Sequence, residues 1–220
     1  MKTLTKLLAA LVTAGACATA GAAPIVLTFE GVGNSANVLE FYNGGTDSVG
    51  NSGTNYGISF SRASLGIIDA DAPGGTGNIG NEPSPSTVLF FLSGNAATMN
   101  VAAGFSTGFS FYYTSSRAGF VNVYDGLDGT GNLLASLSLA ANTGNCAGDP
   151  NGSFCQFDPV GVAFAGIARS VDFGGAADFI AFDNVTLGTS NPTQDVPEPG
   201  TLAMFGLGLA GLARLRRKHA

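Results

Sequence analysis

The sequence of 220 residues contains no tryptophan and only one histidine. The scarcity of histidine excludes catalytic sites that depend on this residue. The single histidine, His219, stands next to the last residue. A Ser-His-Asp triad therefore cannot form in the rest of the chain. The glycine-rich stretch Gly74–Asn78 is not followed by a predicted helix, so it does not have the context of a nucleotide-binding loop.

Basic residues are also scarce between the two ends of the chain. Residues 24–199 contain three Arg, no Lys and all fifteen acidic residues, which gives this part a net charge of −12. Nucleic acid is excluded as a partner, because a protein binds it by neutralising phosphates with Lys and Arg. Acidity favours solubility and is compatible with divalent cations.

Residues 1–22 have the pattern of a secretory signal peptide, with a basic start, an apolar middle and small residues at the end. Lys2 and Lys6 supply the charge, and cleavage is expected after Ala20 or Ala22. The chain is therefore expected to be exported through the secretion machinery.

Cys17 leaves a second interpretation of this segment open. Residues 14–17 partly resemble a lipobox, in which the cysteine becomes a lipidated N-terminus. In the simpler interpretation Cys17 is one more small residue of a segment that is removed.

Residues 24–188 are expected to form one all-β domain. The chain holds 33 glycines and 16 phenylalanines, which suits short strands joined by turns around an aromatic core. No segment of this body shows a sustained helical period. Short segments with one apolar face predict an antiparallel β-sandwich of jelly-roll type. The expected strands are 25–30, 57–61, 87–92, 97–101, 108–113, 119–124, 132–139, 160–164, 169–173 and 179–187.

The clearest alternation lies in residues 108–113 and 119–124, which we expect to pair with each other. The Asp/Gly-rich residues 125–131 then make a turn into the strand 132–139. Residues 70–85 are expected to be a long loop, because Pro, Gly, Asn and Asp occupy most of its positions.

Cys146 and Cys155 remain after removal of the signal peptide, and we expect them to form a disulfide. They lie on either side of a turn rich in Pro, Asn and Gly in an exported protein. A metal or redox role is the weaker alternative, because no histidine is near and the spacing is not Cys-x-x-Cys.

No cofactor is certain, but two acidic stretches are candidates for Ca²⁺. They contain Asp69 and Asp71 in one stretch, and Asp125 and Asp128 in the other. Calcium takes carboxylate and carbonyl oxygens from such loops. The alternative is that Asp and Gly occur there because turns favour them.

No pair of catalytic carboxylates is evident in the sequence. A sugar-binding site is not evident either, but three tyrosines are candidates for it. Glycosidases need two carboxylates at a set separation, and Glu30 and Glu82 are expected in solvent rather than in such a pair. Tyr112, Tyr113 and Tyr124 are candidate platforms for stacking on a sugar ring, with core or edge packing as the alternative. We therefore expect no enzymatic activity.

The end of the chain has three parts after a polar linker, residues 189–195. Val196-Pro197-Glu198-Pro199 is short and stiff, and residues 201–213 form an apolar run without charge. A basic cluster follows, formed by Arg214, Arg216, Arg217 and Lys218. This order over residues 196–219 resembles the PEP-CTERM sorting signal, also labelled ice-binding protein C-terminal domain.

The resemblance implies handling and cleavage by an exosortase, a membrane-embedded enzyme of bacteria that make exopolysaccharide and biofilm matrix. The apolar run is shorter than the roughly 20 residues of a stable transmembrane helix. We therefore expect it to anchor the protein in the inner membrane only transiently, with the basic cluster in the cytoplasm.

The body also resembles the sandwich domains that are often attached to such signals. The resemblance rests on the turn Tyr124–Gly131 and on the closing segment Phe182–Leu187. It implies similarity to carbohydrate-binding sandwiches. The expected function is that of a structural protein of the cell surface or extracellular matrix, associated with exopolysaccharide. The alternative is a carbohydrate-binding module, stabilised by calcium.

Overall fold

The computed structural model describes residues 23–93, 96–149, 151–175 and 177–192. The expected signal peptide, sorting signal and apolar run lie outside these residues. The described residues form nine strands, and every pairing between these strands is antiparallel. In this part of the chain we find no helix that is long and apolar enough to span a membrane.

The strands differ widely in length. Two of them are more than twice as long as any other, and the rest are short. Their bounds are β1 Ile25–Leu27, β2 Ile58–Phe60, β3 Leu65–Ile68, β4 Thr87–Phe90, β5 Ala96–Ser115, β6 Gly119–Tyr124, β7 Leu133–Leu139, β8 Asp158–Gly174 and β9 Ile180–Leu187.

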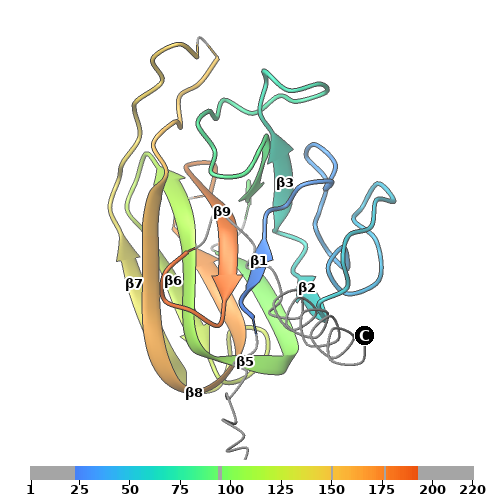
Figure 1. Ribbon diagram of the computed structural model, residues 1–220, viewed down its shortest axis with the longest axis vertical. Helices are drawn as coiled ribbons and strands as arrows, with labels where there is room; N and C mark the ends of the chain where they lie inside the picture. The colour runs from blue at the N-terminus through green and yellow to red at the C-terminus, as the bar shows by residue number, and fades with distance from the viewer. Residues whose placement is uncertain (1–22, 94–95, 150, 176, 193–220) are drawn as a thin grey trace, which may run out of the picture.

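The long strands β5 and β8 run through both layers of a sandwich. In the first layer, residues 96–100 of β5 pair with residues 170–174 of β8, with β2 on one side and β6 and β7 on the other. In the second layer, residues 107–113 of β5 pair with residues 158–164 of β8, and β9, β4 and β3 follow. Strand β1 pairs with the end of β9. Figure 1 shows β5 and β8 as long, strongly curved ribbons.

Glycines allow the two strands to bend between the layers. The register of the β5–β8 pair shifts between Asn100 and Thr107, and Gly104 and Gly166 stand in this region with φ of 76° and 97°. A side chain disfavours such positive φ values, and glycine adopts them at little cost. A Cβ at Gly104 would in addition collide with the Ile167 side chain.

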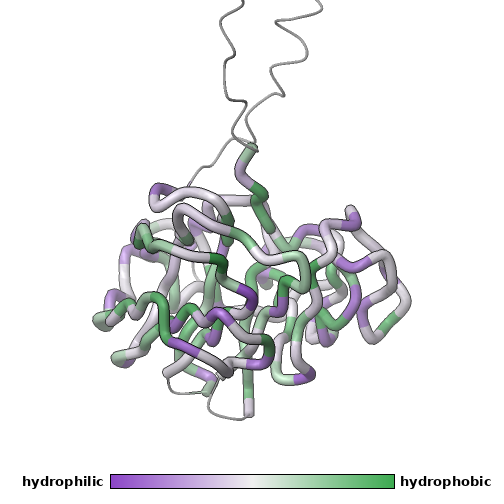
Figure 2. The backbone as a smooth tube through the Cα atoms, turned by 90° about the horizontal axis from the view of Figure 1, so that it is seen from below, coloured by the Kyte–Doolittle hydropathy of each residue, from purple (hydrophilic) through white to green (hydrophobic). Residues whose placement is uncertain are grey.

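The core between the layers is built around Phe173 of the first layer. This ring is fully buried and lies 6.0 Å from Phe109, 6.3 Å from Phe111 and 4.9 Å from Phe182, measured between ring centroids. The three partners belong to the second layer, so the cluster joins the two sheets face to face. Hydrophobic and hydrophilic residues succeed one another along much of the chain in Figure 2, as strands with one buried face require.

The predicted all-β antiparallel sandwich is confirmed, but one predicted pairing is wrong. Residues 108–113 do not pair with residues 119–124. Both edges of β5 are occupied there by β8 and β9, and β6 pairs with β7 and with residues 170–174 of β8. The two segments therefore lie in opposite layers.

The other differences concern the number of strands. The segments 97–101 and 108–113 belong to one strand, β5, and the segments 160–164 and 169–173 belong to β8. Strand β3 was not expected, because its four residues follow one another without a clear alternation. The loop predicted at 70–85 is free of strands, as expected.

Replacing Phe173 with alanine is expected to destabilise the fold by about 3–5 kcal/mol, because a buried ring is lost from both layers at once. Urea unfolding followed by circular dichroism measures the change. The control is Ile167→Ala, which removes a side chain that is more than half exposed and should cost less than about 0.5 kcal/mol. Equal effects of the two substitutions would contradict the proposed core.

Candidate functional site

The outer face of the first layer carries a group of partly exposed aromatic and polar side chains. Alternation along β6 places Phe120, Asn122 and Tyr124 on one side, away from the buried Val121 and Val123. Their cross-strand neighbours lie on the same side. We call this surface the β6 face and define it by Thr98, Phe120, Asn122, Tyr124, Ser136 and Asp172.

Phe120 lies across the neighbouring strand rather than in the core. Its ring occupies the place where a side chain of Gly174 would stand, and a Cβ at Gly174 would collide with it. The ring is 41% exposed. Gly174 therefore lets an aromatic ring rest on the sheet while part of it remains open to solvent.

Hydrogen bonds order the polar part of the β6 face. The Ser136 hydroxyl donates to the Asn122 Oδ1 at 2.7 Å, and the Thr98 hydroxyl donates to the Asp172 Oδ1 at 2.6 Å. Each bond joins residues on different strands, so the side chains are held in fixed orientations.

The turn after β6 closes one end of this face. The Asp128 backbone N–H donates to the Asn100 Oδ1 at 2.8 Å, and the Gly129 N–H donates to the Ser170 hydroxyl at 3.0 Å. Asp125 accepts hydrogen bonds from the backbone and side chain of Asn132, and these bonds lower the pKa of its carboxyl group. Asp125 and Asp128 thus hold a turn together.

The three tyrosines considered for sugar stacking lie in different environments. Tyr124 is half-buried on the β6 face. Tyr113 is 5% exposed, and its hydroxyl donates to the Ala140 carbonyl at 3.1 Å, so its ring belongs to the core. Tyr112 is half-buried on the outer face of the second layer, where it pairs with Asp183. Only Tyr124 of the three belongs to the β6 face.

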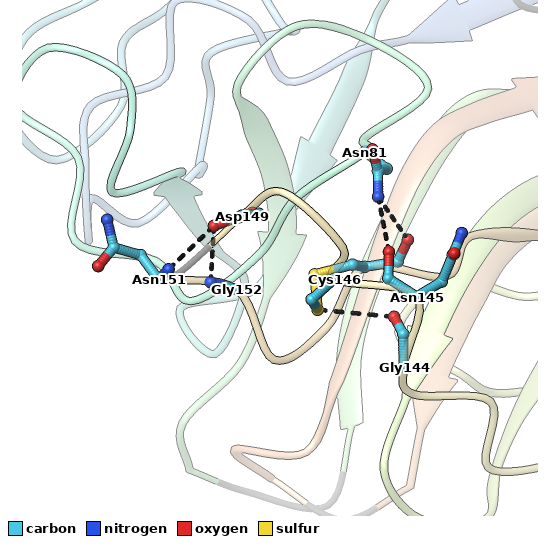
Figure 3. The surroundings of a disulfide bond; sticks show 8 residues. Asn81, Gly144, Asn145, Cys146, Asp149, Asn151 and Gly152 are labelled. Carbon is cyan, nitrogen blue, oxygen red and sulfur yellow. Dashed lines mark hydrogen bonds between the residues drawn. A yellow bond between two sulfur atoms is a disulfide. The ribbon is translucent and has the colours of Figure 1, made fainter.

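The outer face of the second layer is covered by loops, and the predicted disulfide holds one of them. Cys146 and Cys155 are bonded, with their Cα atoms 5.2 Å apart. Figure 3 shows Asn81 pointing to this loop, where its side-chain amide donates to the Asn145 and Cys155 carbonyls at 3.1 and 3.3 Å. The Asp149 carboxylate accepts the N–H groups of the turn itself.

Apolar side chains fill the space beneath this loop. Phe154 and Phe157 from the disulfide loop and its end pack with Ile79, Val88 and Ala181, forming a small second core. The backbone N–H groups of Ser153 and Phe154 donate to the Asn78 carbonyl at 2.7 and 3.1 Å. The disulfide therefore fastens two long loops over the sheet.

The candidate calcium residues are not brought into one cluster. Asp69 accepts the Asp71 N–H, and Asp71 accepts the Asn151 side-chain amide at 2.7 Å, so both lie beside the disulfide loop. Asp125 and Asp128 lie at the β6 face instead. No group of three His, Cys, Asp or Glu side chains in the described ranges is placed to hold a metal ion. Calcium binding at either stretch stays a prediction.

Glu30 and Glu82 are not in open solvent, contrary to expectation. Glu30 is half-buried and accepts the Thr87 N–H at 2.8 Å, and burial raises its pKa. Glu82 is half-buried with an Oε1 atom that has no hydrogen-bond partner among the described residues, and burial raises its pKa to about 7. The folded loop encloses both carboxyl groups, which a sequence of polar loop residues does not reveal.

Asp183 is the most deeply buried acid of this region. It is 0% exposed, and it accepts hydrogen bonds from the Ser84 N–H at 2.8 Å, the Ser84 hydroxyl at 2.7 Å and the Asn184 N–H at 2.6 Å. Burial raises its pKa to about 7 despite these bonds. Asp183 therefore fixes the loop around Ser84 to strand β9.

The sequence interpretation overlooked Phe120, Asn122 and Asp172. Phe120 and Asn122 stand at alternate positions of β6 with Tyr124, so the outward-facing set was visible in the strand pattern. The signal for Asp172 was weaker, because it depends on the pairing of β8 with β6, which joins residues far apart in the chain.

Comparison with known families finds one match. The model described as the PEP-CTERM protein-sorting motif matches residues 195–218. No curated protein matches the sequence.

Comparison with solved structures finds distant neighbours. A family 6 carbohydrate-binding module from Clostridium stercorarium, solved with cellobiose, is 18% identical, with 57% of this chain and 93% of that chain covered and a TM-score of 0.36. A family 29 carbohydrate-binding module from Piromyces equi is 12% identical, with 76% and 91% covered and a TM-score of 0.38. The adhesin domain of Lys-gingipain from Porphyromonas gingivalis is 14% identical, with 59% and 92% covered and a TM-score of 0.33. At these TM-scores the similarities carry no conclusion about function.

The raised pKa of Glu82 makes stability depend on pH. The folded protein keeps a proton that the unfolded chain releases between about pH 4.5 and 7, so the stabilisation is present at the low end of this window and is lost as the pH rises through about 7. Glu82→Gln removes the effect. The variant should melt higher than the wild type at about pH 8 and close to it at about pH 4.5.

Thermal melting across this range measures the difference, and Glu40→Gln is the control, because Glu40 is exposed. If the melting temperature of Glu82→Gln changed with pH in parallel with that of the wild type, burial of Glu82 would not affect stability. Asp183 remains in both proteins and contributes in the same direction.

Removal of the disulfide by the double substitution Cys146→Ser and Cys155→Ser should lower stability by about 2–3 kcal/mol, because the short loop is no longer constrained in the unfolded chain. Proteolysis of the native protein should then cut first within residues 144–156. Unchanged urea unfolding together with unchanged protease resistance would contradict the fastening role.

Proposed function

We propose that this PEP-CTERM protein, which is exported and directed to the cell surface, is a structural component of the surface or extracellular matrix associated with exopolysaccharide. The sorting motif at residues 195–218 carries the proposal. Such a motif implies processing by an exosortase-type enzyme. The proposal includes transient anchoring in the inner membrane through the apolar run and no catalytic role for the body.

The positions of the first and last residues of the body support this export and sorting route. The Gly188 backbone approaches Pro24, and the cavity of about 400 Å³ beside them is lined by Ala23, Phe105 and Leu187 among others. Both ends of the body therefore lie at one end of the sandwich, which we call the pole and define as the end where β5 bends at Gly104. A precursor held at either end in the membrane keeps the same orientation of the body.

The exit of the sorting tail is fixed by contacts with β5 and β8. The Thr107 hydroxyl donates to the Gly188 carbonyl at 2.6 Å, and the Ser110 hydroxyl donates to the Thr189 carbonyl at 3.0 Å. A Cβ at Gly161 would collide with the Ser190 carbonyl oxygen. The backbone thus runs closely over the outer face of the second layer before it leaves the body.

The sorting motif follows closely on the body in the sequence. Val196 is four residues after Pro192, the last residue that the structure describes. The sorting enzyme therefore works beside the pole, and the disulfide loop and the β6 face remain available to other partners.

A second candidate function is carbohydrate binding. The observation that favours it is the partly exposed Phe120 ring next to ordered amide and carboxylate groups. Carbohydrate binding is compatible with a structural role. Many copies of a matrix protein that each bind the polysaccharide weakly are together retained by avidity.

Deletion of residues 196–220 should release the body into the medium as a soluble protein, because the signal that directs it to the envelope is gone. Cell fractionation and immunoblotting measure the distribution. The matched control deletes only residues 219–220, which leaves the basic cluster in place and should keep the wild-type distribution. Wild-type envelope levels of the longer deletion would contradict the sorting proposal.

The matrix association is tested by pull-down of the mature protein on the polysaccharide of the producing cells. We expect retention in the presence and absence of a chelator, and dependence on the chelator would instead support the proposed calcium in the loops. A protein that is released normally but is not retained by this polysaccharide under either condition would contradict the exopolysaccharide role.

A further inference from the structure

The β6 face has the arrangement that an uncharged sugar polymer needs, and this inference rests on the proposed association with polysaccharide. A pyranose ring presents an apolar C–H face and a rim of hydroxyl groups. The apolar face stacks on an aromatic ring, and the hydroxyl groups need side chains that both donate and accept hydrogen bonds. Among the described exposed aromatic residues, Phe120 alone lies on this face.

The polar groups beside Phe120 retain unused hydrogen-bonding capacity. Asn122 uses its Oδ1 to accept the Ser136 hydroxyl, and Asp172 uses its Oδ1 to accept the Thr98 hydroxyl. Among the described residues, no hydrogen bond is formed by the Asn122 Nδ2 or the Asp172 Oδ2. One donor and one acceptor, each on a side chain oriented by a neighbouring strand, thus have hydrogen-bonding capacity that the described residues do not use.

The size of the face suits a chain of sugars rather than a single one. Phe120 and Tyr124 are four residues apart on one strand, which corresponds to roughly 13 Å. The turn that contains Asp128 and Gly129 bounds the face at the Tyr124 end, through its bonds to Asn100 and Ser170.

The charge of the surface decides which polymer fits. The defined face contains one carboxylate, Asp172, and no Lys or Arg, and residues 24–199 carry a net charge of −12. An anionic polysaccharide would be repelled by both, whereas a neutral one is not.

We infer that the β6 face binds a neutral polysaccharide, with Phe120 stacking on one sugar ring and with Asn122 and Asp172 bonding to its hydroxyl groups. Tyr124 extends the contact along the polymer. The binding is weak at each site and gains strength from many copies in one matrix.

Affinity electrophoresis of the full mature protein tests this inference. Native gels contain either a neutral polymer, namely hydroxyethyl cellulose, xylan or galactomannan, or the anionic polymer alginate, or the polysaccharide of the producing cells. We expect retardation of the wild type by at least one neutral polymer and none by alginate. Phe120→Ala should weaken the retention roughly tenfold, as expected for the loss of a stacking ring.

Two further variants separate binding from folding. Asn122→Ala should weaken retention without removing the ring, and melting temperatures verify that each variant remains folded. Tyr56→Ala is the matched control, because Tyr56 is 39% exposed but lies against Tyr42, away from the β6 face. Its retention should equal that of the wild type.

The outcomes distinguish the site from the proposed function. Retention by the cells' own polysaccharide that Phe120→Ala and Asn122→Ala leave unchanged would overturn the β6 site and leave the matrix role intact. Absence of retention by every polymer would overturn the inference and the polysaccharide association together. A change from dimer to monomer in Phe120→Ala, with unchanged retention, would assign the face to contacts between copies and overturn the inference.

Discussion

The structure depends on two strands that continue from one layer into the other. β5 and β8 pair with each other on both sides of a bend, so the position of one layer determines the position of the other. Gly104 and Gly166 permit the bend, and Phe173 then meets the phenylalanines of the opposite layer. Because the two long strands hold the layers together, short partners such as β1 and β2 suffice to complete them.

This arrangement makes the two outer faces unequal. The second layer is covered by long loops, which the disulfide and Asp183 fasten to the sheet and which enclose Glu82. The first layer remains open, with a partly exposed aromatic ring among ordered polar groups. One face therefore contributes stability, and the other is the surface that we propose for polysaccharide binding. The closed face carries the pH dependence, because its carboxyl groups hold protons that the unfolded chain releases.

The local features of the fold could be predicted from the sequence, whereas the features that depend on contacts between distant residues could not. The alternation in β6, the turn after it and the pairing of Cys146 with Cys155 were all predictable, because each involves neighbours in the chain. The pairing of residues 108–113 with residues 119–124 was predicted wrongly. A short gap between two alternating segments is typical of a hairpin, and here it connects opposite layers.

The same limit applies to the candidate site. Phe120 and Tyr124 lie on one strand, so their common side follows from a period of two residues. Asp172 joins them only through the pairing of β8 with β6, and the burial of Glu82 results from a loop that folds onto residues far away in the sequence. The sorting signal needs no fold to be identified, because the order of its parts along the chain is itself the pattern.

The central claim is that the open face of the first layer contacts polysaccharide, and amide chemical-shift mapping tests it most directly. The isotope-labelled mature protein is titrated with fragments of the cells' own polysaccharide and its spectra are recorded. The account predicts shifts at residues 98, 120–124, 136 and 172, with none in the loop fastened by the disulfide. Shifts confined to residues 144–156, or none at saturating polysaccharide, would contradict it.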